Sequence, residues 1–251
     1  MTATEFYQKL KERFRQLLTE HHIENEEVTI FCRALSPEEA IGKTKRQDFP
    51  IISGKDIMIE ANFRGSRGQA FTDAPTAFSG TLGEILESDI AGDSRARSLF
   101  IATVNAVMAH LGLCCGTVHC RTDGPELCAQ DVLAFLRRHY VDCKRICLIG
   151  YQPAMLEMLS KSEFQVRVLD LNPANVGQIR YGVKVEHGVD DYDSVVHGGA
   201  DLILCTGSTV CNGTIVNYLG LDTEVLFFGT TLAGTAVLMG LKRLCFAENY
   251  G

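Results

Sequence analysis

ADLILCTGSTVCNGT, residues 200–214, joins a short apolar run to a group of hydroxyls, glycines and one amide. The run from Leu202 to Cys205 predicts a buried strand, because it is short, apolar and bounded by turn residues. In an open α/β sheet, ligands bind just outside the carboxyl ends of the strands. The stretch therefore predicts a site for a polar small molecule. It holds no evident nucleophile–base pair, so the reaction is left open.

Strands and helices alternate on both sides of this stretch. The predicted strands cover residues 145–150, 166–170, 202–205, 225–228 and 243–247, and the predicted helices include residues 127–140 and 154–159. Such alternation implies a parallel sheet with right-handed crossovers. We therefore predict a Rossmann-like domain over residues 114–251.

The first 113 residues have a different pattern. Thr2 and Glu5 form a capping box before a helix that is expected to end near His21. Alternation of apolar and polar residues predicts strands at 27–35 and 56–63, with a short third at 69–72. Helices are predicted to begin at Gly80 and to cover residues 100–111. This is an α+β arrangement, so we expect one domain over residues 1–113 and a cleft shared with the second domain.

Length, composition and charge limit the class of protein. The 251 residues suffice for one large or two ordinary domains, and a hydrophobic fraction of 46% is typical of a globular protein. The net charge of −7 argues against a nucleic-acid partner, which favours a basic face. No apolar run approaches the roughly 20 residues that span a bilayer, and Met1 leads into charged residues without a signal peptide. We expect a cytoplasmic protein without a membrane partner, and a homo-oligomer is left open.

Ten cysteines raise the question of a metal or disulfide site. A loose group consists of Cys114, Cys115, His119, Cys120, Cys128, Cys143 and Cys147. Zinc sites usually draw ligand pairs from tight knuckles, whereas the chain has no Cys-x-x-Cys motif. Buried free cysteine behaves as a small hydrophobe, and Cys128 fits the apolar face of a helix. The spacing thus favours buried thiols over metal, redox or disulfide chemistry, and we expect no zinc or iron held by cysteines.

Two predicted strand ends resemble part of a nucleotide site. Gly150 ends one strand and Asp170 ends the next, where an acidic residue often meets ribose hydroxyls. The glycine-rich fingerprint is missing, because Gly150-Tyr-Gln-Pro153 offers one glycine. This argues against a conventional NAD site and leaves open a ligand without pyrophosphate, such as S-adenosylmethionine. The alternative for Asp170 is a cap on the Asn-Pro turn that follows it.

Several motifs together resemble one known family. They are Gly150-Tyr-Gln-Pro153, Asp170-Leu-Asn-Pro173, Thr206-Gly-Ser-Thr209, Asn212-Gly-Thr214 and Phe228-Gly-Thr-Thr231, with Ser79-Gly-Thr-Leu-Gly-Glu-Ile-Leu86 and Ala102-Thr-Val-Asn-Ala106 upstream. They resemble a bacterial and archaeal family of unknown function labelled a "putative heavy-metal chelation" domain, preceded by its usual amino-terminal partner domain. The resemblance extends from about Asp56 onward. It implies an enolase amino-terminal-like α+β domain, then a Rossmann-like domain, with a ligand site between them.

The strand ends and the matching motifs define the candidate ligand-binding residues. These are Asn105, Gly150, Tyr151, Pro153, Asp170, Asn172, Thr206, Gly207, Ser208, Asn212, Gly213, Thr214 and Thr230. The hydroxyls and the Asn212 amide would hydrogen-bond the ligand, and the Asp170 carboxylate would accept hydrogen bonds from the ligand's hydroxyls or from a ring N–H. Backbone amides of the helix starting near Pro153 would face an anionic group. Asn105 is either bonded to neighbouring backbone, as buried polar groups require, or, as the family match suggests, points into the cleft.

The leading hypothesis is an enzyme or enzyme-like domain pair that acts on a polar heterocycle or a metal-chelating metabolite. The matching motifs carry hydroxyl, amide and carboxylate groups instead of a thiolate or imidazole set. Any metal is therefore expected to arrive within an organic chelate, or the protein acts in making one. The alternatives are a non-catalytic carrier of a metal chelate and an S-adenosylmethionine-dependent methyltransferase. The sequence assigns no cofactor, metal ligand or catalytic residue, and whether the protein is an enzyme is left open.

Overall fold

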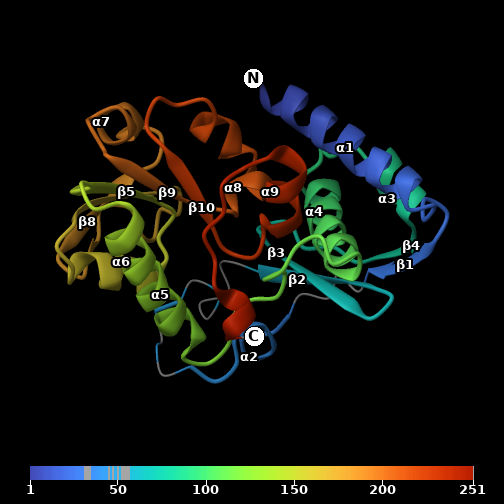
Figure 1. Ribbon diagram of the computed structural model, residues 1–251, viewed down its shortest axis with the longest axis horizontal. Helices are drawn as coiled ribbons and strands as arrows, with labels where there is room; N and C mark the ends of the chain where they lie inside the picture. The colour runs from blue at the N-terminus through green and yellow to red at the C-terminus, as the bar shows by residue number, and fades with distance from the viewer. Residues whose placement is uncertain (31–34, 45, 47, 50, 52–56, 251) are drawn as a thin grey trace.

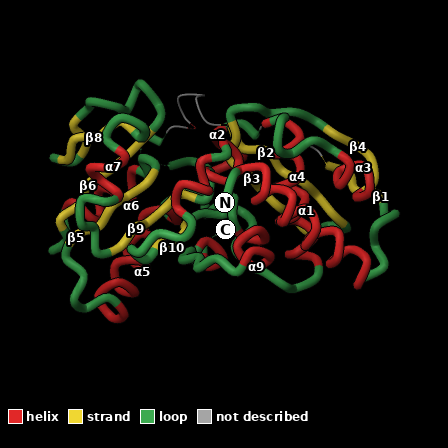
Figure 2. The backbone as a smooth tube through the Cα atoms, turned by 90° about the horizontal axis from the view of Figure 1, so that it is seen from above, coloured by secondary structure: helices red, strands yellow, loops and turns green. Residues whose placement is uncertain are grey.

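Two sheets lie beside each other with helices packed between them (Figure 1). The computed structural model describes residues 1–30, 35–44, 46, 48–49, 51 and 57–250. Figure 2 shows the same two lobes from above, with the amino-terminal sheet in one and the larger sheet in the other. The mixed α/β fold with a mainly parallel six-stranded sheet is the predicted class.

The first lobe is an antiparallel sheet of order β3-β2-β1-β4 with helices on it. Its elements are α1 (Ala3–Glu20), β1 (Glu27–Ile30), α2 (Pro37–Ile41), β2 (Ile57–Phe63), β3 (Ser66–Thr72), β4 (Phe78–Thr81), α3 (Leu82–Glu87) and α4 (Ser94–His110). The capping box at Thr2 forms as predicted, since Thr2 and Glu5 each accept the other's backbone N–H. Helix α4 packs closely on β3, because Gly68 has no Cβ to meet the helix backbone at Ala102 and Ala106.

The second lobe has the sheet order β10-β9-β5-β6-β8-β7. Its elements are α5 (Gly124–His139), β5 (Arg145–Ile149), α6 (Pro153–Ser160), β6 (Gln165–Asp170), β7 (Ile179–Arg180), β8 (Val183–His187), α7 (Tyr192–Val196), β9 (Leu202–Thr206), α8 (Thr209–Asn212), η2 (Thr214–Tyr218), β10 (Val225–Phe228), α9 (Ala233–Met239) and η3 (Ala247–Asn249). All pairings are parallel except the β7–β8 hairpin. After β5 the chain forms β6, β7 and β8 on one side, with β8 between β6 and β7, and then β9 and β10 on the other side.

The predicted strand over residues 243–247 is wrong. Arg243 makes a single bridge to Phe227, and the chain then turns into η3. The prediction at 27–35 holds for β1, and its residues 31–34 lie outside the described residues. The domain boundary between residues 113 and 114 stays a prediction.

One hydrophobic cluster connects the two lobes. Central strands of the large sheet bury alternate residues on opposite faces, so that Leu148 and Leu204 pack with α5 and α6. On the other face, Ile149 and Ile203 share a cluster with Phe100 of α4 and with residues of α1. Within this cluster, helices α1 and α4 of the first lobe contact α8, η2 and α9 of the second lobe.

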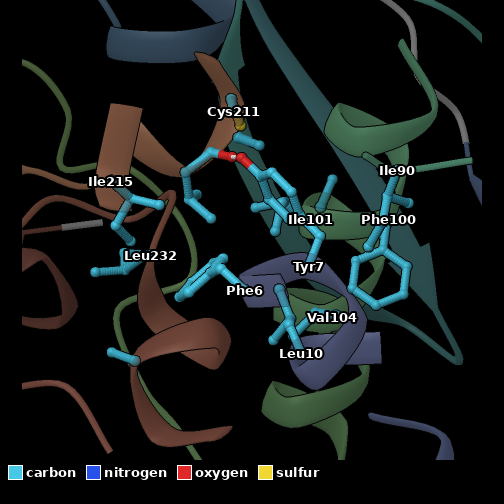
Figure 3. Close-up of a cluster of buried hydrophobic side chains, with 14 of the residues drawn as sticks. Phe6, Tyr7, Leu10, Ile90, Phe100, Ile101, Val104, Cys211, Ile215 and Leu232 are labelled. Carbon is cyan, nitrogen blue, oxygen red and sulfur yellow. Dashed lines mark hydrogen bonds between the residues drawn. The ribbon is translucent and has the colours of Figure 1, made fainter. Parts of the chain in front are cut away.

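Helix α1 is attached to the second lobe by a buried hydrogen bond (Figure 3). The Tyr7 hydroxyl donates to the carbonyl of Val210 at 2.6 Å. Phe6, Leu10 and Leu232 belong to the same buried apolar cluster, and the Arg97 guanidinium lies over the Tyr7 ring at 4.6 Å from its centroid. Burial raises the pKa of Tyr7 well above its ordinary value, so the hydroxyl stays protonated and donates.

We expect Tyr7→Phe to lower the free energy of unfolding by about 1–2 kcal/mol, because the buried Val210 carbonyl loses its donor. Urea unfolding measures the loss. Tyr192→Phe is the matched control, since its hydroxyl donates to the Asn217 carbonyl at an exposed position. Equal stability of Tyr7→Phe and the native protein would contradict the expected role of this bond.

Candidate functional site

A cavity of about 290 Å³ opens at the carboxyl ends of the parallel strands. Gly150 after β5, Asp170 at the end of β6, Thr206 at the end of β9 and Phe228 at the end of β10 all line it. The strand order reverses between β5 and β9, and ligands of open α/β sheets bind at such a switch point. The cavity therefore lies where this fold class places its ligands.

Gly150 lets the two strand ends at the switch point come together. Its φ is +85°, a left-handed conformation, and a Cβ there would lie 2.6 Å from the Thr206 methyl carbon. Gly207 is restricted by space alone, because a Cβ would lie 2.8 Å from Cβ of Leu232. At both positions, which line the cavity, glycine permits a close approach between neighbouring segments of the chain.

The Asp170 carboxylate organises the adjacent turns. One of its oxygens accepts the N–H of Tyr151 and the other that of Asn172, both at 2.6 Å. The side chain therefore caps the turn that follows it, the alternative role considered from the sequence, and also fixes the loop after β5. Removal of Asp170 would disturb backbone that lines the cavity as well as any ligand contact.

Most of the candidate residues line this one cavity: Gly150, Tyr151, Pro153, Asp170, Asn172, Thr206, Gly207, Ser208, Asn212, Thr214 and Thr230. The loop after β9 has an internal set of bonds, in which Asn212 Oδ1 accepts from the backbone and hydroxyl of Thr214 at 3.0 and 2.7 Å. Gly213 supplies the left-handed turn between Asn212 and Thr214 and does not line the cavity.

Helix α6 offers little of its amino terminus to an anion. Gln152 already accepts the N–H of Met155, and Pro153 has no N–H to give. The expectation that backbone amides near Pro153 bind an anionic group stays a prediction, with fewer free N–H groups than an uncapped helix would offer. Pro153 contributes an apolar wall instead.

Asn105 does not reach the cavity, and its proposed ligand contact is corrected here. The side chain is fully buried, and its Nδ2 donates to the carbonyls of Gln69, Thr230 and Thr231 at 2.9–3.2 Å. Its Oδ1 accepts the N–H of Gly234 at 2.8 Å. The amide thus holds the loop after β10 against β3, and it positions Thr230 without facing a ligand itself.

Thr230 differs from the other hydroxyls of the site. It is 2% exposed and lines the cavity, yet its Oγ1 is buried without a hydrogen-bond partner. Thr209, also on the cavity, donates to the Thr206 carbonyl at 2.7 Å. An unpaired buried hydroxyl costs free energy, which a ligand atom in the cavity would offset.

A segment of the first lobe forms part of the cavity wall. Phe49 and Ile51 line it, and the neighbouring Asp48 accepts a hydrogen bond from the Tyr151 hydroxyl at 3.2 Å. Burial, together with the Asp48 charge, raises the pKa of Tyr151 to about 12. Arg46 pairs with Glu126 at 2.7 Å and also with Glu157, which fastens the segment to α5 and α6.

His119 and three thiols line the cavity and were not among the predicted site residues. The thiols are Cys120, Cys128 and Cys245. His119 Nδ1 donates to the Cys120 carbonyl at 2.6 Å, which leaves Nε2 as an acceptor. Burial lowers the pKa of His119, so its ring is neutral near pH 7. A cysteine-rich connector was visible in the sequence, but its placement against the strand ends depends on long-range packing.

No preformed metal site was found within the part of the chain that the structure describes: no group of three or more His, Cys, Asp or Glu side chains there could hold an ion. The nine described cysteines are all free. The same residues contain no helix long and apolar enough to cross a membrane.

Comparison with known proteins supports the family resemblance. Residues 132–240 match a family model, DUF364, described as "putative heavy-metal chelation". No curated protein matches the chain. The resemblance inferred from the strand-end motifs is thus confirmed over this stretch.

Two solved structures of DUF364 family proteins align with most of this chain. A protein of unknown function from Desulfitobacterium hafniense DCB-2 aligns with a TM-score of 0.51 and 11% identity, over 94% of this chain and 84% of its own. One of unknown function from Pyrococcus horikoshii aligns with a TM-score of 0.49 and 14% identity, over 89% of this chain and 78% of its own. At 11% identity the likeness to the Desulfitobacterium hafniense protein shows the fold alone.

Proposed function

We propose that the cavity binds a small polar heterocycle or metal-chelating metabolite, and that any metal enters as part of that chelate. The buried, unpaired hydroxyl of Thr230 is the observation that carries this proposal. Its free energy cost is explained if a ligand atom completes the hydrogen bond. Ser208 and the Asn212 amide add uncharged polar groups to the same wall.

The size and lining of the cavity limit the ligand. About 290 Å³ lies at the lower end of ligand cavities, roughly 300–1,000 Å³, which suits a single ring system with short substituents better than a dinucleotide. Phe71, Tyr151 and Phe228 provide flat apolar surface for such a ring. Asp170 already accepts two backbone N–H groups, so it is a weaker candidate for ribose recognition than the sequence suggested.

Chemical processing of the ligand would need a proton acceptor, and His119 can provide one. Its neutral ring keeps Nε2 free to accept a proton, with Nδ1–H held by the Cys120 carbonyl. His119→Gln would then abolish turnover and leave binding largely intact. If the protein is a carrier instead, no turnover occurs in either form.

Thr230→Val tests the proposal with little disturbance of the fold. Because the buried hydroxyl has no protein partner, the variant should be at least as stable as the native protein, whereas ligand affinity should fall roughly tenfold. Native mass spectrometry of the purified protein identifies the bound small molecule and its occupancy. Titration of the released molecule back into each variant gives the affinity.

Thr235→Val is the matched control. Its hydroxyl is also buried and unpaired, but Thr235 does not line the cavity. It should be at least as stable as the native protein and should leave ligand affinity unchanged. Equal affinity of the Thr230→Val and Thr235→Val proteins would contradict a ligand contact at Thr230.

A further inference from the structure

Asn175 is a buried residue of the cavity wall that was not among the predicted contacts. It lies in the loop that follows β6, lines the cavity and is 8% exposed. Its side-chain amide forms no hydrogen bond with any residue that the structure describes. Buried polar groups nearly always have a hydrogen-bond partner, and the lack of one costs free energy. We therefore looked for a partner of this amide outside the chain.

The main chain around Asn175 is held firmly, in contrast to the side-chain amide. The Asn175 N–H donates to the Asn172 carbonyl at 2.8 Å, and the Asn175 carbonyl accepts from the Gln178 N–H at 3.0 Å. The Gly177 N–H donates to the Val185 carbonyl at 2.8 Å, which attaches the loop to β8. The backbone thus keeps Asn175 at the cavity without any contribution from the amide.

Most other buried polar or charged side chains of the described residues are hydrogen-bonded. The bonded ones are Gln69, Thr72, Arg97, Ser98, Thr103, Asn105, Thr117, Thr209 and Thr231. Those without a partner are Asn175, Thr230 and Thr235, and the first two line the cavity. Tyr218 is 5% exposed and also lines it, and its hydroxyl has no partner among the same residues. Unpaired polar groups thus come to this cavity from the loops after β6, β9 and β10.

The chemistry of an asparagine amide determines what it selects. Its oxygen accepts and its nitrogen donates, and both lie in one plane. An asparagine therefore pairs side by side with a ring edge that carries a donor next to an acceptor. A lactam edge, in which a ring N–H lies beside a ring carbonyl, has this arrangement. A hydroxyl such as that of Thr230 or Tyr218 rotates to suit a donor or an acceptor, so it selects less.

We propose that Asn175 selects a heterocycle with a lactam edge, accepting a hydrogen bond from the ring N–H and donating one to the ring carbonyl. This inference rests on the proposed function and narrows the class of ligand. The hydroxyls of Thr230 and Tyr218 contact further polar atoms of the same molecule. A heterocycle whose lactam nitrogen is methylated binds more weakly, because the Asn175 oxygen is then left buried without a donor.

The test titrates the dialysed full-length protein with small lactams by ligand-observed NMR. The probes are 2-pyridone, 1-isoquinolone and 4-quinazolinone, each compared with the derivative that is methylated on the lactam nitrogen. At least one N–H lactam should bind about tenfold more tightly than its N-methyl partner. In Asn175→Leu, whose side chain has as many heavy atoms but no polar group, this preference should fall to about twofold or less. Asn217→Leu is the matched control, since Asn217 is exposed and lies outside the cavity, and it should keep the native preference.

Urea unfolding provides a readout that needs no probe. Because the amide has no protein partner, Asn175→Leu should be at least as stable as the native protein. A clear loss of stability would mean that the amide is bonded within the protein, and it overturns the proposal.

Three results of the titration also overturn it: no N–H lactam binds, the N–H and N-methyl partners bind equally, or the preference survives in Asn175→Leu. The proposed function can hold in each of these cases. It is then seen in a co-purified heterocycle whose affinity falls in Thr230→Val. If the proposed function fails as well, no small molecule co-purifies and no probe binds.

Discussion

Asn105→Ala should lower the free energy of unfolding by roughly 3 kcal/mol. The native side chain bonds three backbone carbonyls and one N–H inside a fully buried region. Alanine leaves several of these groups without a partner or water, at about 1–3 kcal/mol for each group. Ligand affinity should fall as well, because the loop that carries Thr230 loses its attachment to β3. Urea unfolding and ligand titration measure the two effects.

Asn105→Asp separates the donor from the acceptor. It keeps an oxygen for the N–H of Gly234 but brings a second oxygen toward the carbonyls of Gln69, Thr230 and Thr231. It should be at least as destabilising as the alanine variant. Gln130→Ala, at an exposed position of α5, is the control and should change stability little. A loss below about 1 kcal/mol in both Asn105 variants would contradict the role assigned to this amide.

Gly150→Ala should lower the free energy of unfolding by about 2–3 kcal/mol and narrow the cavity that Gly150 lines. Left-handed backbone is unfavourable by about 1–2 kcal/mol for a residue with a Cβ. The new methyl group would also overlap the Thr206 methyl carbon, since the two carbons would be 2.6 Å apart. Thermal unfolding measures the loss of stability, and the affinity for the co-purified molecule shows whether the cavity still binds it.

Two further variants distinguish the strain of the left-handed backbone from the overlap with the Thr206 methyl group. Gly177→Ala introduces the backbone strain without any overlap, since φ of Gly177 is +80° and nothing lies within 4 Å of its Cβ position. The double variant Gly150→Ala with Thr206→Ser removes the overlapping methyl group. It should recover most of the stability that Gly150→Ala loses beyond the loss in Gly177→Ala. If Gly150→Ala and Gly177→Ala lose equal stability, contact with Thr206 does not determine the residue at position 150.

Much of the second lobe could be predicted because its strands are short, apolar and bounded by turns. Strands β5, β9 and β10 lie where such runs predict them. Strand β8 was missed, since Lys184 and Glu186 give it a polar alternation at the sheet margin. Strand β4, with the sequence Phe-Ser-Gly-Thr, has the composition of a turn and is held by pairing with β1.

The candidate site was predictable where it follows from strand ends. The end of each parallel strand is fixed by the strand itself, so Gly150, Asp170 and Thr206 could be placed together before their contacts were known. Asn105 could not be assigned in this way. Its orientation depends on the packing of α4 on β3, and that packing turns the amide toward the loop after β10.

The cavity takes a large part of its wall from outside the stretch that matches the family model. Ile41, Phe49, Phe71, His119 and Cys245 all lie beyond residues 132–240, while the strand-end hydroxyls lie within them. Proteins that share those hydroxyls can therefore diverge in ligand choice through the remaining wall. A ligand identified for one relative should be transferred to another only after these wall residues have been compared.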